Sequence, residues 1–157
     1  MISFNDLNGY RVDLSFEKDS FSIEPQHVLV LAQKGHKWLL TNHPKRGIEF
    51  PGGKKEVYET IEEAAIRETL EETNVAVYRL EWFAEYVVHD VKPFCKAVFI
   101  AEVKDIHTEA VHYETDGAVW LTSKELESCP NLSFHMKDKG MEVILKEVMI
   151  YEERWND

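Results

Sequence analysis

Three glutamates in the middle of the chain have the spacing of a metal site. Glu68, Glu71 and Glu72 stand at positions i, i+3 and i+4, and residues at these spacings share one face of an α-helix. A hard cation such as Mg²⁺ prefers carboxylate oxygens and often completes its shell with phosphate oxygens of a substrate. Glutamates on one helix also suit a solvated surface, so the spacing alone leaves both alternatives open.

The residues before this helix favour the metal alternative. Pro51 is followed by Gly52 and Gly53, and a Gly-Gly turn lets the backbone approach a ligand closely. The carbonyl of Gly52 would supply an oxygen ligand opposite the three carboxylates, and Gly53 would lie against the substrate. The ammonium group of Lys54 could bind a phosphate directly, although a lone lysine also suits a solvated surface.

The composition favours a phosphorylated substrate only if a cation accompanies it. The chain has 29 acidic and 18 basic residues and a formal charge of −11, which repels polyanions unless a cation intervenes. Its 157 residues, 44% of them apolar, suffice for one domain, expected at residues 1–157. Without a signal sequence, a membrane span or a Cys-x-x-Cys pair in the sequence, we expect a soluble cytoplasmic protein.

Short strands and two helices must position these residues. Apolar or alternating runs predict strands at residues 10–16, 27–33, 37–41, 75–86, 94–103 and 118–121. Gly35 can adopt the positive φ of a tight hairpin between the second and third runs. A C-terminal amphipathic helix is predicted because apolar residues recur at steps of three, four and seven from Met141. We therefore expect an α/β fold, with a mixed β-sheet sandwiched between α-helices.

The helix that carries the glutamates has clear start and stop signals. Thr60 and Glu63 form a capping-box pattern, and Asn74 suits the left-handed conformation that ends a helix. On a helical wheel Ile66 and Leu70 fall on the side away from the glutamates. We expect these two residues to pack on the sheet.

Residues 53–75 resemble the Nudix box, usually written G-x5-E-x7-R-E-U-x-E-E-x-G-U with U a bulky aliphatic residue. Two positions depart from it, Thr69 in place of an aliphatic residue and Asn74 in place of glycine, and neither is a charged position. The resemblance implies the Nudix fold and a Nudix hydrolase. The matching residues are Gly53, Glu59, Arg67, Glu68, Glu71, Glu72 and Val75.

The resemblance extends beyond the box. The lead-in at residues 50–54 looks like that of the MutT-type enzymes, and Glu114 stands six residues before Trp120, as a metal-binding glutamate does in that group. The whole pattern is similar to the YtkD-type nucleoside triphosphatases. That similarity implies Mg²⁺-dependent hydrolysis of purine nucleoside triphosphates, including 8-oxo-dGTP, to a monophosphate and pyrophosphate. Mn²⁺ is the alternative metal.

Roles for individual residues follow from the resemblance. Glu68, Glu71, Glu72, the Gly52 carbonyl and Glu114 would coordinate the metal, and either Glu68 or Glu114 would be the general base.

Two further pairs complete the expected site. Arg67 would pair with Glu59 and orient the loop on the helix, or else be a surface partner of Glu63 or Glu71. Asn131 and Phe134 would contact the base, because the loop after Trp120 lies where MutT-type enzymes place such contacts.

Other functions remain as alternatives. The same metal cluster could remove pyrophosphate from triphosphorylated RNA 5′ ends, although the acidic balance disfavours a polyanion. A nucleotide-binding regulatory module without turnover is a second alternative, disfavoured because binding alone needs no water-activating glutamates. The seven histidines lack zinc-ligand spacing, and no serine-hydrolase elbow or P-loop motif occurs.

Overall fold

The computed structural model describes residues 1–107 and 117–155, the last five of these by their backbone alone. In that part of the chain nine strands form one sheet, with the order β1-β2-β7-β8-β3-β4-β5 and with β6 paired to β3 and β9 to β4. The strands are β1 (Ile2–Asn5), β2 (Arg11–Ser15), β3 (Pro25–Lys34), β4 (Lys37–His43), β5 (Gly47–Glu49), β6 (Gly52–Lys54), β7 (Val75–Val88), β8 (Phe94–Ile106) and β9 (Ala118–Thr122).

The sheet is mixed, as predicted. Strands β3 and β8 are parallel over most of their length, whereas the other strand pairs are antiparallel. The expected hairpin joins β3 to β4, with Gln33 opposite Trp38 and Gly35 at a φ of 61°. Its tight turn therefore uses the backbone freedom of glycine.

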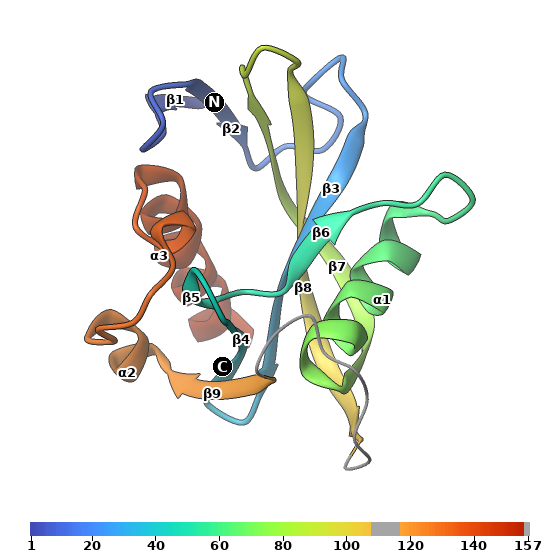
Figure 1. The fold of residues 1–157 in the computed structure, drawn as a ribbon, viewed down its shortest axis with the longest axis vertical. Coiled ribbons are helices and arrows are strands. Elements are labelled where there is room, and N and C mark those ends of the chain that lie inside the picture. The colour runs from blue at the N-terminus through green and yellow to red at the C-terminus, as the bar shows by residue number, and fades with distance from the viewer. Residues whose placement is uncertain (108–116, 156–157) are drawn as a thin grey trace.

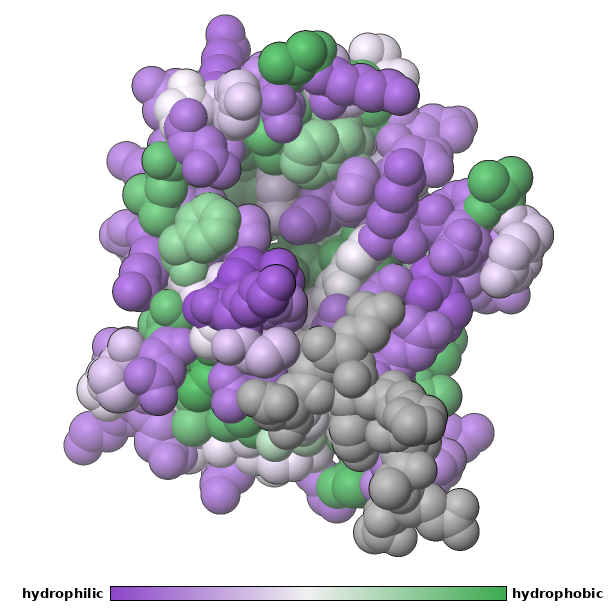
Figure 2. Space-filling model, in the orientation of Figure 1, coloured by the Kyte–Doolittle hydropathy of each residue, from purple (hydrophilic) through white to green (hydrophobic). Residues whose placement is uncertain are grey.

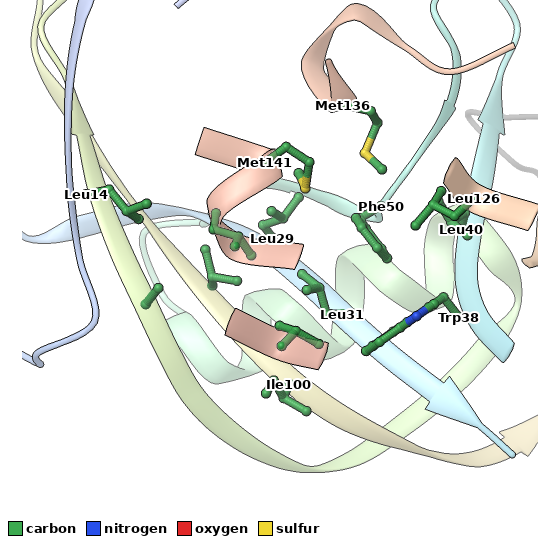
Figure 3. Close-up of a cluster of buried hydrophobic side chains, with 14 residues drawn as sticks. Leu14, Leu29, Leu31, Trp38, Leu40, Phe50, Ile100, Leu126, Met136 and Met141 are labelled. Atoms are coloured by element: carbon green, nitrogen blue, oxygen red, sulfur yellow. The ribbon is translucent and has the colours of Figure 1, made fainter. Parts of the chain in front are cut away.

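Helices cover both faces of the sheet (Figure 1), which confirms the predicted α/β sandwich. Helix α1 (Ile61–Thr73) covers one face, where Ala64 and Ala65 pack in a cluster with Val28 and Val30 of β3. Helix α3 (Lys139–Trp155) covers the other, where a larger cluster surrounds Phe50 (Figure 3). The two short helices are α2 (Ser123–Glu127) and η1 (Phe134–Met136).

Helix α1 has the predicted ends but not the predicted packing face. Thr60 and Glu63 form the capping box and Asn74 adopts a φ of 61°. Ile66, expected on the sheet, is 38% exposed, whereas Ala64 and Ala65 are fully buried. Their small side chains let the helix lie close to the sheet, and the buried face is rotated toward the glutamates.

The N-terminal part and the C-terminal helix also differ from expectation. Strand β1 was not predicted, and it pairs only with β2, at the edge of the sheet. Helix α3 begins before Met141, because Asp138 Oδ1 accepts a hydrogen bond from the Met141 N–H at 2.8 Å. No helix in the described part of the chain is long and apolar enough to cross a membrane.

Candidate active site

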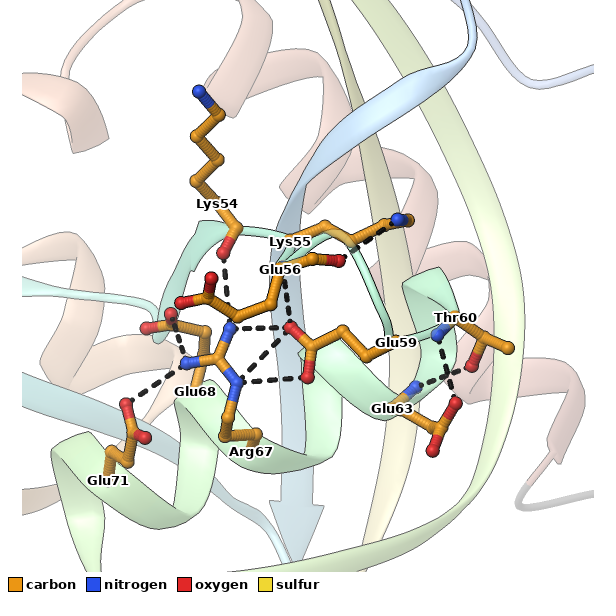
Figure 4. A network of polar contacts seen from close by, with 9 residues as sticks. All are labelled: Lys54, Lys55, Glu56, Glu59, Thr60, Glu63, Arg67, Glu68 and Glu71. Atoms are coloured by element: carbon orange, nitrogen blue, oxygen red, sulfur yellow. Dashed lines mark hydrogen bonds and ion pairs between the residues drawn. The ribbon is translucent and has the colours of Figure 1, made fainter.

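Arg67 is the centre of a hydrogen-bonded network that joins α1 to the loop before it (Figure 4). Its Nε donates to Glu59 Oε2 at 3.0 Å, and its Nη2 donates to Glu59 Oε1 at 2.6 Å. Nη2 also donates to the carbonyl of Lys54 at 3.1 Å. The predicted ion pair between Arg67 and Glu59 is therefore present, and it fastens residues 54–59 to the helix.

The other end of the same guanidinium contacts the glutamates of the helix. Arg67 Nη1 donates to Glu68 Oε1 at 2.8 Å and to Glu71 Oε2 at 3.1 Å. The alternative partner Glu71 thus binds Arg67 as well, whereas Glu63 bonds to Thr60 in the capping box. The guanidinium group of Arg67 therefore holds both the loop and the helix carboxylates in place.

This arrangement shifts the pKa values of its members. Hydrogen bonds from Arg67 and from the backbone N–H of Glu56 lower the pKa of Glu59 to about 2, because they stabilise the ionised carboxylate. The hydrogen bonds to Glu59 raise the pKa of Arg67 above its ordinary value. The ion pair is therefore charged throughout the neutral range.

The two glycines, predicted to form a turn, lie instead in strand β6, where close approaches require them. A Cβ atom at Gly53 would lie 2.6 Å from Cδ of Glu68, and one at Gly52 would lie 2.2 Å from the carbonyl oxygen of Val28. Gly52 therefore lets β6 approach β3, and Gly53 makes room for the carboxylate of Glu68. Glu68 is 9% exposed, so this carboxylate is held between α1 and β6.

Glu72, four residues after Glu68 on helix α1, also contacts β6. The backbone N–H of Gly52 donates to Glu72 Oε2 at 3.1 Å. This hydrogen bond brings Gly52 and Glu72, two of the expected metal-site residues, into contact. Glu71 joins Glu68 through Arg67, and its side chain is 46% exposed.

The donor set suits a hard divalent cation, because it consists of carboxylate oxygens beside the backbone of β6. Within residues 1–107 and 117–155, however, no three acidic, histidine or cysteine side chains are already gathered as a metal site. Arg67 Nη1 lies between Glu68 and Glu71, and the Gly52 N–H holds Glu72.

A cavity of about 290 Å³ opens beside the network. Gly52, Gly53 and Glu72 line one end of it, and Figure 2 shows the molecular face hollowed between β6 and the side of α3. Its other walls come from β1, β2, the strands beneath α3 and the start of α3 itself. Apolar residues of these walls include Phe4, Leu29, Phe50, Tyr86, Phe134 and Met141.

The predicted substrate residues are distributed unevenly around this cavity. Gly53 and Phe134 line it, and Phe134 is 41% exposed. Asn131 does not line it; its backbone carbonyl accepts a hydrogen bond from β5 at 2.8 Å. The side chain of Lys54 extends away from the Arg67 network in Figure 4. Glu114 lies outside the described residues.

An ion pair on the cavity wall was missed by the sequence analysis. Arg46 Nη2 lies 2.7 Å from Glu49 Oε1, and both residues line the cavity. Burial acts to raise the pKa of Glu49, but hydrogen bonds from Arg46 and Ser133 outweigh it and the pKa is lowered. The sequence signal for this ion pair was the opposite charges of Arg46 and Glu49, three residues apart and just before Pro51.

Known proteins resemble this chain along most of its length. Residues 23–142 match the model of the NUDIX domain. A protein of Bacillus subtilis (strain 168) named "Putative 8-oxo-dGTP diphosphatase YtkD" is 39% identical over 151 residues, which cover 94% of this chain and 96% of the relative.

Solved structures show the same relationship. The crystal structure of the Bacillus subtilis pyrophosphohydrolase BsRppH is 38% identical, covers 96% of this chain and 98% of its own, and superposes with a TM-score of 0.87. The structure of a NUDIX hydrolase from Nitrosomonas europaea is 20% identical and shares the fold, with a TM-score of 0.65. The match covers 81% of this chain and 90% of that protein. Nudix hydrolases generally use divalent metal ions and act on substrates of nucleotide type. The chain belongs to the Nudix hydrolase family.

Proposed function

We propose that the chain hydrolyses purine nucleoside triphosphates, 8-oxo-dGTP among them, to a nucleoside monophosphate and pyrophosphate with Mg²⁺. The observation that carries the proposal is the position of Glu72. This carboxylate belongs to the glutamate face of α1 and also lines the cavity, so a nucleotide in the cavity would present its phosphates to the glutamates. The relative named as an 8-oxo-dGTP diphosphatase supports the same substrate class.

Glu68, Glu71 and Glu72 would hold the metal, with the Gly52 carbonyl and Glu114 as further ligands and Mn²⁺ as the alternative ion. A bound divalent ion supplies charge neutralisation at phosphate oxygens and a lowered pKa for an attacking water. Glu68 or Glu114 would accept the proton of that water.

The remaining residues position the reacting groups. Arg67 and Glu59 keep the loop and the helix in register, and Arg67 holds Glu68 under Gly53. Lys54 would bind a phosphate group. Phe134 would contact the base from the cavity wall. Asn131, three residues before it, would also contact the base.

Removal of pyrophosphate from triphosphorylated RNA 5′ ends is the second candidate. The observation that favours it is the similarity to BsRppH, a pyrophosphohydrolase. The formal charge of −11 counts against a longer polyanion, since backbone phosphates are usually bound by clustered Lys and Arg. A non-catalytic regulatory module is disfavoured by the presence of all three helix glutamates together with Arg67.

A substrate panel ranks these functions. The purified chain is assayed with Mg²⁺ on GTP, 8-oxo-dGTP, ATP and a short triphosphorylated RNA, and every product is identified. We expect monophosphate and pyrophosphate from the free purine nucleotides. A large preference for the RNA would replace the first proposal by the second, and nucleotide binding without any phosphate release would favour the regulatory module.

A further inference from the structure

Three basic side chains form a row across the sheet. His27 of β3 lies opposite Lys54 of β6 on one side and beside Lys96 of β8 on the other. Residues paired on neighbouring strands project from the same face, and strands lie about 4.8 Å apart. The backbones of the two lysines are therefore roughly 10 Å apart, with His27 between them.

The row lies on the face of the sheet that carries the cavity. Lys96 lines the cavity, as does its neighbour Tyr86 on β7. Leu29, two positions after His27 on the same strand, packs in the cluster beneath α3, and residues two positions apart on a strand share a face. Gly53, next to Lys54, lines the same cavity. The row thus runs from the cavity wall at Lys96 to β6 at Lys54.

The lysines of this row have no carboxylate in direct contact among the described residues, although the charge of Lys96 acts on Asp138, which also lines the cavity. Within residues 1–107 and 117–155, Lys54 and Lys96 form no ion pair; the Lys96 ammonium lies 5.7 Å from the centre of the Tyr86 ring. The His27 ring packs on Phe94 at 4.7 Å, and its Nδ1 is buried without a hydrogen-bond partner. Burial and the charges of Lys96 and Lys54 lower the pKa of His27.

An anion would give the donors of this row acceptors that they lack among the contacts of the described residues. The row keeps two ammonium groups, on the strands either side of β3, in a chain whose formal charge is −11. Ammonium groups bind phosphate oxygens as point charges, and a neutral imidazole still has one N–H to donate. An anion placed over His27 would contact a donor on each of the three strands.

We propose that His27, Lys54 and Lys96 form a binding site for a phosphate group of the substrate, separate from the glutamates of α1. This site deepens the proposed function and rests on it, because a nucleotide must occupy the cavity. The phosphate has two sources, the polyphosphate chain of a free nucleotide or the phosphodiester that joins the first two nucleotides of an RNA. Both present the same anionic oxygens.

Anion binding is tested first without turnover. With metal removed by a chelator, the wild-type chain is titrated with inorganic tripolyphosphate while NMR follows the His27 ring. We expect a saturable shift of the ring resonances that Lys96→Gln weakens roughly tenfold or more, the effect of losing one charge-assisted hydrogen bond. The matched control is Lys104→Gln, which removes the same charge from an exposed position of β8.

The titration overturns the site if the wild-type ring shows no saturable shift, or if the two variants bind alike. Because it needs no hydrolysis, its result stands even if the wild-type enzyme acts on no nucleotide and the proposed function fails.

Hydrolysis identifies the source of the phosphate. The ratio kcat/KM of Lys96→Gln and of Lys104→Gln is measured on GTP and on a triphosphorylated dinucleotide. A loss on both substrates specific to Lys96→Gln assigns the site to the polyphosphate chain, and a loss on the dinucleotide alone assigns it to the phosphodiester. Equal values for the two variants on both substrates contradict the proposal.

Discussion

The carboxylate of Glu68 occupies the space in which a side chain at position 53 would lie. A Cβ atom at Gly53 would stand 2.6 Å from Glu68 Oε2 and 2.8 Å from Oε1. Gly53 of β6 and Glu68 of α1 are therefore one steric unit, although they stand fifteen positions apart in the sequence. A side chain at position 53 should therefore displace the carboxylate of Glu68.

Gly53→Ala should displace Glu68 and lower activity more than stability. We expect kcat/KM to fall roughly tenfold or more, and the free energy of unfolding to fall by about 1–3 kcal/mol, as for overpacking elsewhere. Gly35→Ala is the control: it also has a positive φ but open space around it, so it should lose stability and keep activity. Similar activity losses in both variants would show that the Glu68 contact is unimportant.

Glu72→Gln should remove most turnover without changing the fold. The neutral amide keeps an oxygen that can accept the Gly52 N–H, but it loses the charge that a cation needs. We expect kcat to fall by roughly 100-fold or more and Mg²⁺ affinity to weaken, with an unchanged melting temperature. Steady-state kinetics and calorimetry measure this against Glu62→Gln, an exposed position on the same helix. Near-normal hydrolysis by Glu72→Gln would exclude the metal role.

Arg67→Lys should destabilise the loop and the helix together. An ammonium group cannot replace the planar guanidinium that contacts Glu59, Glu68 and the Lys54 carbonyl at once. We expect the free energy of unfolding, measured in urea, to fall by about 1–3 kcal/mol. Arg79→Lys, in an ion pair whose arginine side chain is 70% exposed, should cost less than about 0.5 kcal/mol. Equal costs would mean that the Arg67 network behaves as a surface contact.

The acid limb of the stability profile should depend on Glu59. In the folded chain Arg67 lowers the pKa of Glu59 from an ordinary 4.5 to about 2. As the pH falls, Glu59 is therefore protonated in the unfolded chain before it is protonated in the folded chain. The stability due to this ion pair is complete above the unfolded pKa and is lost as pH falls toward 2. We expect the stability gap between wild type and Glu59→Gln to narrow over that range. A gap that stays constant from pH 6 to about 2 would contradict the assigned pKa shift.

The sequence predicted features whose causes are local. The caps of α1 depend on Thr60, Glu63 and Asn74 alone, and residues within a few positions determine such caps. The pair of Arg67 with Glu59 was predicted because both belong to a recognisable motif. Local chemistry and a known motif were sufficient for the helix and its network.

Features that depend on tertiary packing were missed or wrong. Strand β1 reaches the cavity because Phe4 packs where Gly140 has no side chain, and nothing near Phe4 in the sequence indicates that contact. Ile66 was placed on the sheet because apolar residues usually mark the buried face. The structure buries Ala64 and Ala65 instead, since the close approach of α1 leaves room only for small side chains.

The most direct test of the central claim is hydrolysis of GTP as a function of Mg²⁺, with the products identified by ³¹P NMR. The account predicts no hydrolysis in excess chelator, recovery as Mg²⁺ is restored, and equal amounts of monophosphate and pyrophosphate. Hydrolysis that is unchanged by the chelator, or no release of phosphate from any purine nucleoside triphosphate with Mg²⁺ or Mn²⁺, would contradict it.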